Sequence, residues 1–292
     1  MKKIFLLLLP LLVACSSHTT TQNNTATFTD DYGRTVAVPT APQRVVSLSP
    51  AVTEIIFALG ADSILVGRTD FCLYPPAAAS IPSIGGISNL GIENILAQQP
   101  DLVISGSMIP RKATDQMEAL GVPMVCVIEK PHFEALYDNI RTIGHLVGRE
   151  QEADSLIALL QQRMKLEINT QETQNQSNNL PSVYYVVGFG AGGNFTAGGN
   201  TFINDIISLA GGRNIAADIE GWSYSLEALM DADPDFIIVR REDSAAFCSS
   251  KPYNKLSAVK NGNVIGIVSG TLDLQVPRNI DAVIYLRNRF NQ

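Results

Sequence analysis

Six aromatic residues lie in segments that the sequence predicts to be loops, where together they could bind a bulky, largely apolar ligand. These residues are Phe71, Tyr74, Phe189, Phe195, Trp222 and Tyr224. An apolar cleft with a few polar groups is typical of small-molecule sites, and aromatic rings supply much of the contact area. Trp222 is the only tryptophan and stands just before a predicted helix, which favours a role in binding. The alternative is that about half of these rings belong to the core.

The polar residues near these loops indicate binding rather than catalysis. Candidate polar contacts are Arg68, Asp70, Arg240, Arg241, Asp273 and Arg278. The chain has no phosphate-binding loop, no serine-nucleophile elbow and no metalloprotease motif. Its three histidines, His18, His132 and His145, share no metal-ligand spacing, so no metal site built by the protein alone is predicted. A metal ion would arrive already chelated by the ligand.

A stretch of sequence occurs twice. Residues 92–104 (IENILAQQPDLVI) match residues 226–238 (LEALMDADPDFII), and in both a Glu precedes a Pro by seven positions. Earlier in each half, residues 53–60 resemble residues 204–211. Two matches in the same order favour two related lobes.

The repeat places Glu93 and Glu227 at the start of corresponding predicted helices. A carboxylate there complements the helix dipole by a few tenths to about 1 kcal/mol, which alone could explain both residues. The alternative is functional: the two acids, one in each lobe, form a pair that docks on a basic partner with two-fold symmetry.

Strands alternate with helices along most of the chain, which predicts mostly parallel sheets covered by helices on both faces. The predicted strands include residues 101–105, 122–127, 182–187, 236–239 and 264–268. The predicted helices include residues 92–99, 112–120, 133–147, 202–210, 226–230 and 278–290.

Residues 149–173 predict one long helix, because apolar residues recur at spacings of three and four without Pro or Gly. It separates a predicted N-terminal lobe, residues 28–148, from a predicted C-terminal lobe, residues 174–292. The predicted fold class is therefore α/β, with two doubly wound lobes joined by a single long rigid helix. The alternative is an ordinary amphipathic helix within one α/β domain.

The N-terminus predicts a bacterial lipoprotein signal. Residues 1–14 combine two lysines with an apolar run too short to span a bilayer, and Cys15 follows as the expected lipidation site. Residues 15–27 are polar and predict a flexible tether. An ordinary secretory signal with a coincidental Cys is the alternative.

Composition limits the partners and the cysteine chemistry. A net charge of -7 offers no basic field for nucleic acid. Cys72, Cys126 and Cys248 remain besides Cys15, and this odd count is not a disulfide framework, although a Cys72–Cys248 bridge stays open.

The chain resembles the class III substrate-binding proteins of ABC importers, which carry vitamin B12, ferric siderophores or haem. The resemblance covers about residues 28–290 and rests on residues 47–61 (SLSPAVTEIIFALGA), the 70–76 loop (DFCLYPP), the two Glu and Pro-Asp repeats and the long helix. It implies a lipid-anchored, monomeric binding protein in the periplasm or on the cell surface. It implies no catalysis and no resident cofactor.

The resemblance also assigns residue roles. Glu93 and Glu227 would dock on arginines of a permease dimer that works with ATPase subunits. Phe71, the Tyr74 loop and the Trp222 region resemble ligand contacts of that family. Together with Phe189 and Tyr224 from the aromatic loops, Phe71, Tyr74 and Trp222 are the predicted ligand contacts. The Tyr74 loop and the Trp222 region favour a corrinoid such as vitamin B12, although residues 84–90 lack an aromatic ring and residues 269–275 lack an Asp/Arg pair. A ferric siderophore or haem therefore stays open; Tyr74, Tyr184 or Tyr224 could be the axial haem ligand.

Two other classes of function stay open at this point. One is a chelatase-like enzyme, since two-lobed α/β proteins with cleft sites include such enzymes. The other is a surface adhesion or scaffold protein, which would bind no small molecule.

Overall fold

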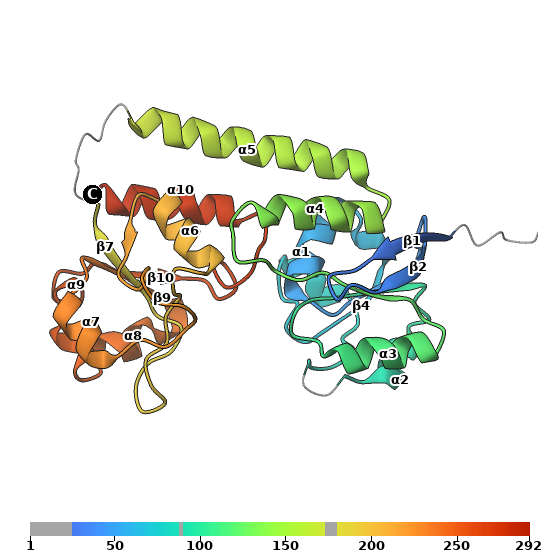
Figure 1. Ribbon diagram of the computed structural model, residues 1–292, viewed down its shortest axis with the longest axis horizontal. Helices are drawn as coiled ribbons and strands as arrows, with labels where there is room; N and C mark the ends of the chain where they lie inside the picture. The colour runs from blue at the N-terminus through green and yellow to red at the C-terminus, as the bar shows by residue number, and fades with distance from the viewer. Residues whose placement is uncertain (1–24, 88–89, 173–179) are drawn as a thin grey trace, which may run out of the picture.

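The computed structural model describes residues 25–87, 90–172 and 180–292. Figure 1 shows two α/β lobes side by side, with the long helix α5 (Glu150–Glu172) lying across both. The predicted signal peptide, Cys15 and most of the predicted tether lie outside the described residues. The N-terminal lobe begins earlier than predicted, because strand β1 starts at Thr25 rather than at residue 28. In the described part of the chain, no helix combines the length and apolarity needed to cross a bilayer.

The N-terminal lobe is built on a parallel sheet with strand order β4-β3-β5-β6. The strands are β3 (Val45–Ser47), β4 (Leu65–Arg68), β5 (Leu102–Ser105) and β6 (Met124–Cys126). The helices are α1 (Pro50–Ala58), α2 (Ile92–Ala97), α3 (Arg111–Ala119) and α4 (Ala135–Leu146), with 3₁₀ turns η1 (Asp62–Ile64) and η2 (Pro76–Ser80). An antiparallel hairpin of β1 (Thr25–Thr29) and β2 (Thr35–Pro39) precedes them.

The C-terminal lobe repeats this plan with strand order β10-β9-β7-β8. The strands are β7 (Ser182–Tyr185), β8 (Arg213–Asn214), β9 (Phe236–Arg240) and β10 (Val264–Ile267). The helices are α6 (Phe202–Leu209), α7 (Leu226–Ala232), α8 (Arg241–Ser249), α9 (Ser257–Lys260) and α10 (Asn279–Phe290), with the 3₁₀ turn η3 (Tyr253–Lys255). In both sheets the first strand along the chain lies between the second and the third, so the two predicted lobes have one topology.

The repeated Pro-Asp pair has the same structural role in each lobe. The carboxylate of Asp101 accepts a hydrogen bond of 3.0 Å from the backbone N–H of Arg44, just before β3. The carboxylate of Asp235 accepts one of 2.7 Å from the backbone N–H of Ser182, the first residue of β7. Each aspartate therefore anchors the start of the neighbouring strand, which explains why both copies need Asp there.

Both faces of each sheet are buried, and alternate side chains point to different apolar clusters. Ile104 and Tyr185 belong to a large core that includes α5, whereas Val103 and Tyr184 belong to smaller clusters on the opposite faces. Figure 1 shows α2, α3, α7, α8 and α9 on the side of the molecule away from α5. Burial on both faces is what parallel strands with helical crossovers require.

The helix α5 packs along the large core with one apolar face. Ala153, Ile157, Leu160 and Met164 are buried on it, at spacings of three and four residues. The approach to α4 is close because Gly144 has no side chain: a Cβ there would lie 2.6 Å from the Cβ of Ala153. The ion pair of Arg163 on α5 with Asp281 on α10, at 2.5 Å, ties the same helix to the C-terminal lobe.

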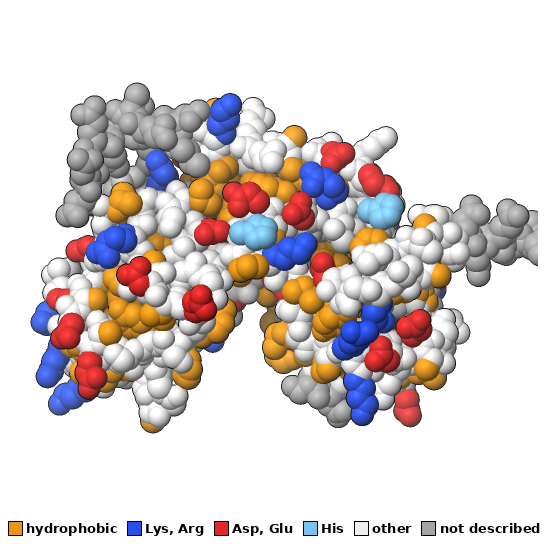
Figure 2. Space-filling view, in the orientation of Figure 1, with side chains coloured by type: hydrophobic (Ala, Val, Ile, Leu, Met, Phe, Trp, Pro, Cys, Tyr) orange, Lys and Arg blue, Asp and Glu red, His pale blue; other side chains and the backbone are white. Residues whose placement is uncertain are grey.

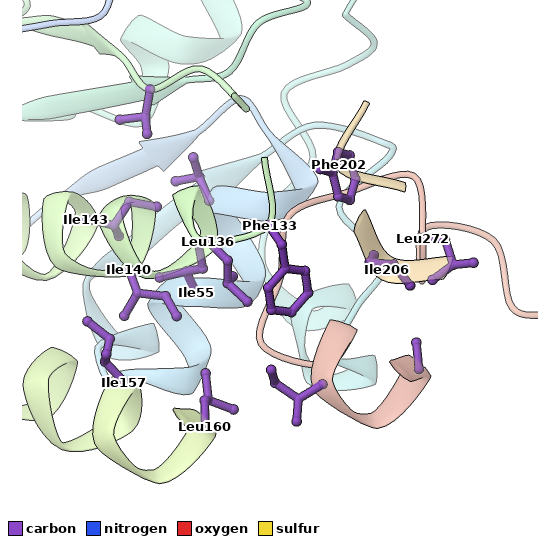
Figure 3. Close-up of a cluster of buried hydrophobic side chains, with 14 of the residues drawn as sticks. Ile55, Phe133, Leu136, Ile140, Ile143, Ile157, Leu160, Phe202, Ile206 and Leu272 are labelled. Carbon is purple, nitrogen blue, oxygen red and sulfur yellow. The ribbon is translucent and has the colours of Figure 1, made fainter. Parts of the chain in front are cut away.

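The lobes are joined by more than the predicted helix, because one apolar core runs through both. Figure 3 shows Phe133 of the N-terminal lobe between Leu136 on one side and Ile206 and Leu272 of the C-terminal lobe on the other. All four residues belong to one cluster, together with Leu160 of α5. The backbone N–H of Phe133 donates to the carboxylate of Asp205 at 3.0 Å, which adds a polar link between the lobes.

A buried amide forms a second polar link between the lobes. The side chain of Gln275 is fully buried, and its Oε1 accepts from the backbone N–H of Lys130 at 3.1 Å and from Asn139 Nδ2 at 3.2 Å. Its Nε2 donates to the carbonyls of Lys130 at 2.7 Å and His132 at 3.0 Å. One C-lobe side chain therefore satisfies several polar groups of the N-terminal lobe.

We predict that Gln275→Ala lowers the free energy of unfolding by about 2–4 kcal/mol, because it leaves these groups buried without partners. Chemical denaturation followed by circular dichroism measures the change. The control is Gln116→Ala on the exposed face of α3, where we expect a change within about 0.5 kcal/mol. Equal effects of the two substitutions would contradict the role of Gln275.

Candidate functional site

The loops that follow the strands of both sheets meet between the lobes. In an open α/β sheet, ligands bind at the carboxyl ends of the strands, beside the point where the strand order reverses. The two sets of loops touch where the guanidinium of Arg278, after β10, lies over the ring of Tyr74, after β4, with 4.3 Å from Cζ to the ring centroid. Figure 2 shows a hollow between the lobes on the side away from α5. This hollow is the candidate ligand cleft.

The N-terminal wall of the cleft carries exposed aromatic rings on a firmly held loop. Phe71 is 57% exposed and Tyr74 is 46% exposed. Between them, Cys72 is fully buried, and its Sγ lies 3.2 Å from Thr69 Oγ1. The buried guanidinium of Arg68 donates to the carbonyls of Thr69 and Ala78 at 2.9 and 2.8 Å. The loop therefore turns Cys72 inward and leaves the two rings facing outward.

The structure also shows whether the described cysteines form a disulfide. Cys72, Cys126 and Cys248 are all free thiols, so the Cys72–Cys248 bridge that the sequence left open is not formed.

In the C-terminal lobe, Trp222 lies in the loop between β8 and α7 and is 47% exposed. The carbonyl of Trp222 accepts from the backbone N–H of Thr196 at 2.8 Å, and Gly198 N–H donates to the Gly221 carbonyl at 2.9 Å. A Cβ on Gly198 would lie 2.5 Å from the carbonyl oxygen of Ile219, so only glycine permits this contact. Glycine at position 198 is thus needed for the Trp222 loop to pack against residues 196–198.

Phe189 and Tyr224, two other predicted ligand contacts, are half-buried and pack within the C-terminal lobe. The Phe189 ring meets Phe247 and Tyr253 edge-on, at centroid distances of 5.2 and 5.6 Å. The Tyr224 ring lies 5.7 Å from that of Tyr184. Their ligand contacts remain predictions. In the structure, both rings pack against other aromatic rings of the C-terminal lobe.

Two exposed apolar residues near the strand ends were not predicted from the sequence as candidate ligand contacts. Met108 is 73% exposed in the loop that follows β5, and Val268 is exposed directly after β10. Their position just beyond the end of a buried strand was the signal that could have found them, because the carboxyl ends of parallel strands line such sites.

The polar groups of the cleft include an Arg–Asp pair at the ends of the C-lobe strands. Arg240, the last residue of β9, has its Nε 3.8 Å from an Asp273 carboxylate oxygen, a distance too long for a hydrogen bond. Tyr185, at the end of β7, donates its hydroxyl to the same carboxylate. Burial, together with the negative charge of Asp273, raises the pKa of Tyr185 well above its usual value. The pair therefore presents a donor and an acceptor side by side.

Three other predicted polar contacts are Arg68, Asp70 and Arg241. Arg68 is used within its own loop, and Asp70 accepts a hydrogen bond of 2.5 Å from Ser83 Oγ. Arg241 is exposed at the start of α8.

The tyrosines that the sequence offers as haem ligands differ sharply in access. Tyr184 is almost fully buried beside Tyr224, and burial raises the pKa of its hydroxyl. The hydroxyl of Tyr224 donates to the carbonyl of Ile215 at 3.3 Å. Tyr74 is the most exposed of the three. Within residues 25–87, 90–172 and 180–292, no cluster of three His, Cys, Asp or Glu side chains could hold a metal ion.

The two predicted docking acids occupy matching positions in the two lobes. Glu93 and Glu227 are both exposed second residues of their helices, α2 and α7. Two positions on, Ile95 and Leu229 are buried and hold each helix to its lobe. Figure 1 shows α2 and α7 in different lobes, both on the side away from α5. The two carboxylates are therefore free to meet a partner at that side.

Comparison with known proteins agrees with this architecture. A cobalamin-binding protein of Halobacterium salinarum is 27% identical over 269 residues, which cover 88% of this chain and 71% of that protein. An uncharacterized ABC transporter substrate-binding lipoprotein of Bacillus subtilis is 27% identical over 262 residues, which cover 88% of this chain and 82% of that protein. A periplasmic haem-binding protein from Pseudomonas aeruginosa superimposes with a TM-score of 0.77 at 29% identity, covering 85% of this chain and 92% of that one.

All three relatives are named as binding proteins rather than enzymes. The family model described as periplasmic binding protein matches residues 45–269. Because that match spans more than half of the chain and includes both walls of the cleft, the chain belongs to the periplasmic binding protein family.

Proposed function

We propose that this chain is the lipid-anchored substrate-binding component of an ABC importer, and that its cleft holds a metal chelate, with a corrinoid such as vitamin B12 favoured. The observation that carries the proposal is the exposure of aromatic rings on both lobes, with Phe71 and Tyr74 on one lobe and Trp222 on the other. Large exposed apolar groups around a hollow mark a binding site, and rings suit a broad, flat ligand. Binding and release suffice for transport, so no catalytic group is needed.

A corrinoid is favoured because it does not need metal ligands from the protein. The cobalt of cobalamin is held by its own macrocycle, and the described residues offer no cluster of metal ligands. The Arg240–Asp273 pair suits the neutral carboxamides on a corrin rim, because an amide both accepts and donates hydrogen bonds. The relative from Halobacterium salinarum, named as a cobalamin-binding protein, supports the same choice.

Haem is the second candidate because of Tyr74. A haem iron can take a tyrosine as axial ligand, and the Tyr74 ring is exposed on the cleft wall. The solved relative from Pseudomonas aeruginosa, named as a haem-binding protein, supports this alternative.

Delivery to the membrane rests on two further features. Glu93 and Glu227 present one exposed carboxylate per lobe, which suits a permease dimer that carries matching basic groups. Cys15, which lies outside the described residues, would carry the lipid that keeps the protein close to that permease.

We predict that cyanocobalamin quenches the fluorescence of the mature chain saturably, since Trp222 is the only tryptophan. Trp222→Ala, followed by equilibrium dialysis, should weaken binding about tenfold or more, because a buried ring contributes about 1.5–3 kcal/mol. Tyr285→Ala, which removes an exposed ring from α10, is the control and should leave affinity unchanged. Binding of haemin alone would select the haem alternative. Binding of neither these two nor ferric siderophores would refute the proposed function.

The second prediction concerns docking. Glu93→Ala combined with Glu227→Ala should leave cyanocobalamin affinity intact and abolish its uptake by cells that depend on this chain, because the proposal assigns both acids to permease docking and not to the ligand site. The matched control, Glu152→Ala with Asp154→Ala on the exposed face of α5, removes the same charge and should not impair uptake. Lost affinity in the first double variant would place the acids in the ligand site and reject docking.

The third prediction concerns the anchor. Cys15→Ser should move the protein from the membrane fraction to the soluble fraction without changing its affinity for cyanocobalamin, because the lipid attaches to the Cys15 thiol. Metabolic labelling with a radioactive fatty acid should mark the parent chain and not the variant. A variant that stays in the membrane fraction would show that another segment holds it there.

A further inference from the structure

One side chain, Arg278, connects the two lobes at the inner end of the cleft. It belongs to the C-terminal lobe, directly before α10, and its side chain is only 15% exposed. Its Nε donates to both carboxylate oxygens of Glu54 on α1 of the N-terminal lobe, at 3.1 and 3.0 Å. The same guanidinium lies over the ring of Tyr74. Arg278 therefore contacts the body of the opposite lobe and one of its cleft rings at once.

The other nitrogens of Arg278 are held by its own loop. Nη1 donates to Thr271 Oγ1 at 3.2 Å, and Nη2 donates to the carbonyl of Gly270 at 3.1 Å. Gly270 has a φ of +77°, and a Cβ there would lie 3.2 Å from Nη2, so glycine leaves room for the guanidinium. All three nitrogens thus have partners inside the protein, and the orientation of the guanidinium plane is fixed.

Glu54 makes this link more than a surface ion pair. Its carboxyl is buried, and burial raises its pKa to about 7, while the charge of Arg278 acts in the opposite direction. Removing the cationic partner of a buried carboxylate is strongly destabilising. The pair therefore keeps Arg278 against α1, and with it the position of the loop between β10 and α10.

We propose that Arg278 is a positioning residue of the cleft, which holds the Tyr74 ring and fixes the separation of the two walls without itself contacting the ligand. This inference rests on the proposed function, in which Tyr74 belongs to the ligand site. Tyr74 is held by the guanidinium yet remains 46% exposed, so part of its ring stays open to a ligand. A ring ordered before binding does not have to be ordered by the ligand, which favours affinity.

A double-mutant cycle tests the proposal, with cyanocobalamin affinity measured by Trp222 quenching and haemin titrated in parallel. Arg278→Lys keeps the charge opposite Glu54 but removes the planar group above Tyr74, and should weaken affinity about fivefold. Tyr74→Ala should weaken it at least as much. Because both changes remove the same oriented ring, the double variant should bind no more weakly than Tyr74→Ala alone.

The control is Arg163→Lys, which alters the ion pair between α5 and Asp281 of α10 and should leave affinity unchanged. Thermal melts set the titrations at a temperature where every variant is folded. If Arg278→Lys does not fold, Glu54→Gln replaces it, with the same expected loss and the same non-additivity with Tyr74→Ala. Unchanged affinity, or losses that multiply in the double variant, would overturn the positioning role. A parent chain that binds neither probe nor a ferric siderophore would instead remove the proposed function, and the inference with it.

Discussion

The apolar core shared by the two lobes is the constraint on which the cleft depends. Residues of both sheets, of α5 and of the segment around Phe133 form one cluster, so the lobes cannot separate without exposing apolar surface. The buried amide of Gln275 adds hydrogen bonds between the lobes at the same depth. The walls of the cleft are therefore held at a set distance before any ligand arrives. A preformed site of this kind favours affinity because little conformational entropy is lost on binding.

The second organising feature is the repetition of one local solution in both lobes. Gln99 and Asp233 each stand before a proline and have φ values of 48° and 35°, in the left-handed region that residues other than glycine seldom adopt. The next aspartate in each copy then anchors the adjacent strand. Because helix, turn and strand recur as a unit, the acid at the start of each helix recurs with them. A pair of matched carboxylates, one on each lobe, follows from that repetition.

The fold could be predicted because its determinants are local in the sequence. The exposure of the site residues could not be predicted, because it depends on contacts with distant residues. Alternating strands and helices and the duplicated Pro-Asp segment are visible in single stretches of sequence, and both lobes follow from them. Helix α8 escaped prediction because Phe247 is its only buried apolar side chain, so the sequence shows no periodic face. Phe189 and Trp222 look alike as loop aromatics, yet Phe189 meets Phe247 and Tyr253, which lie 58 and 64 residues further along the chain, and Trp222 does not. Long-range contacts of that kind leave no local signal.

The contacts between the lobes differ between the buried core and the cleft surface. The buried contacts contribute to folding stability, and the exposed ones are available for ligand binding. Gln275 is fully buried and its partners are all protein groups, so its hydrogen bonds contribute to folding. Tyr74, at the other extreme, is open to the cleft. Arg278 lies between them, with a buried ion pair at one end of its contacts and an exposed ring at the other. The same guanidinium makes both contacts, so any shift of one lobe against the other also shifts the Tyr74 ring. The interactions that hold the lobes together therefore also set the position of a ring in the cleft.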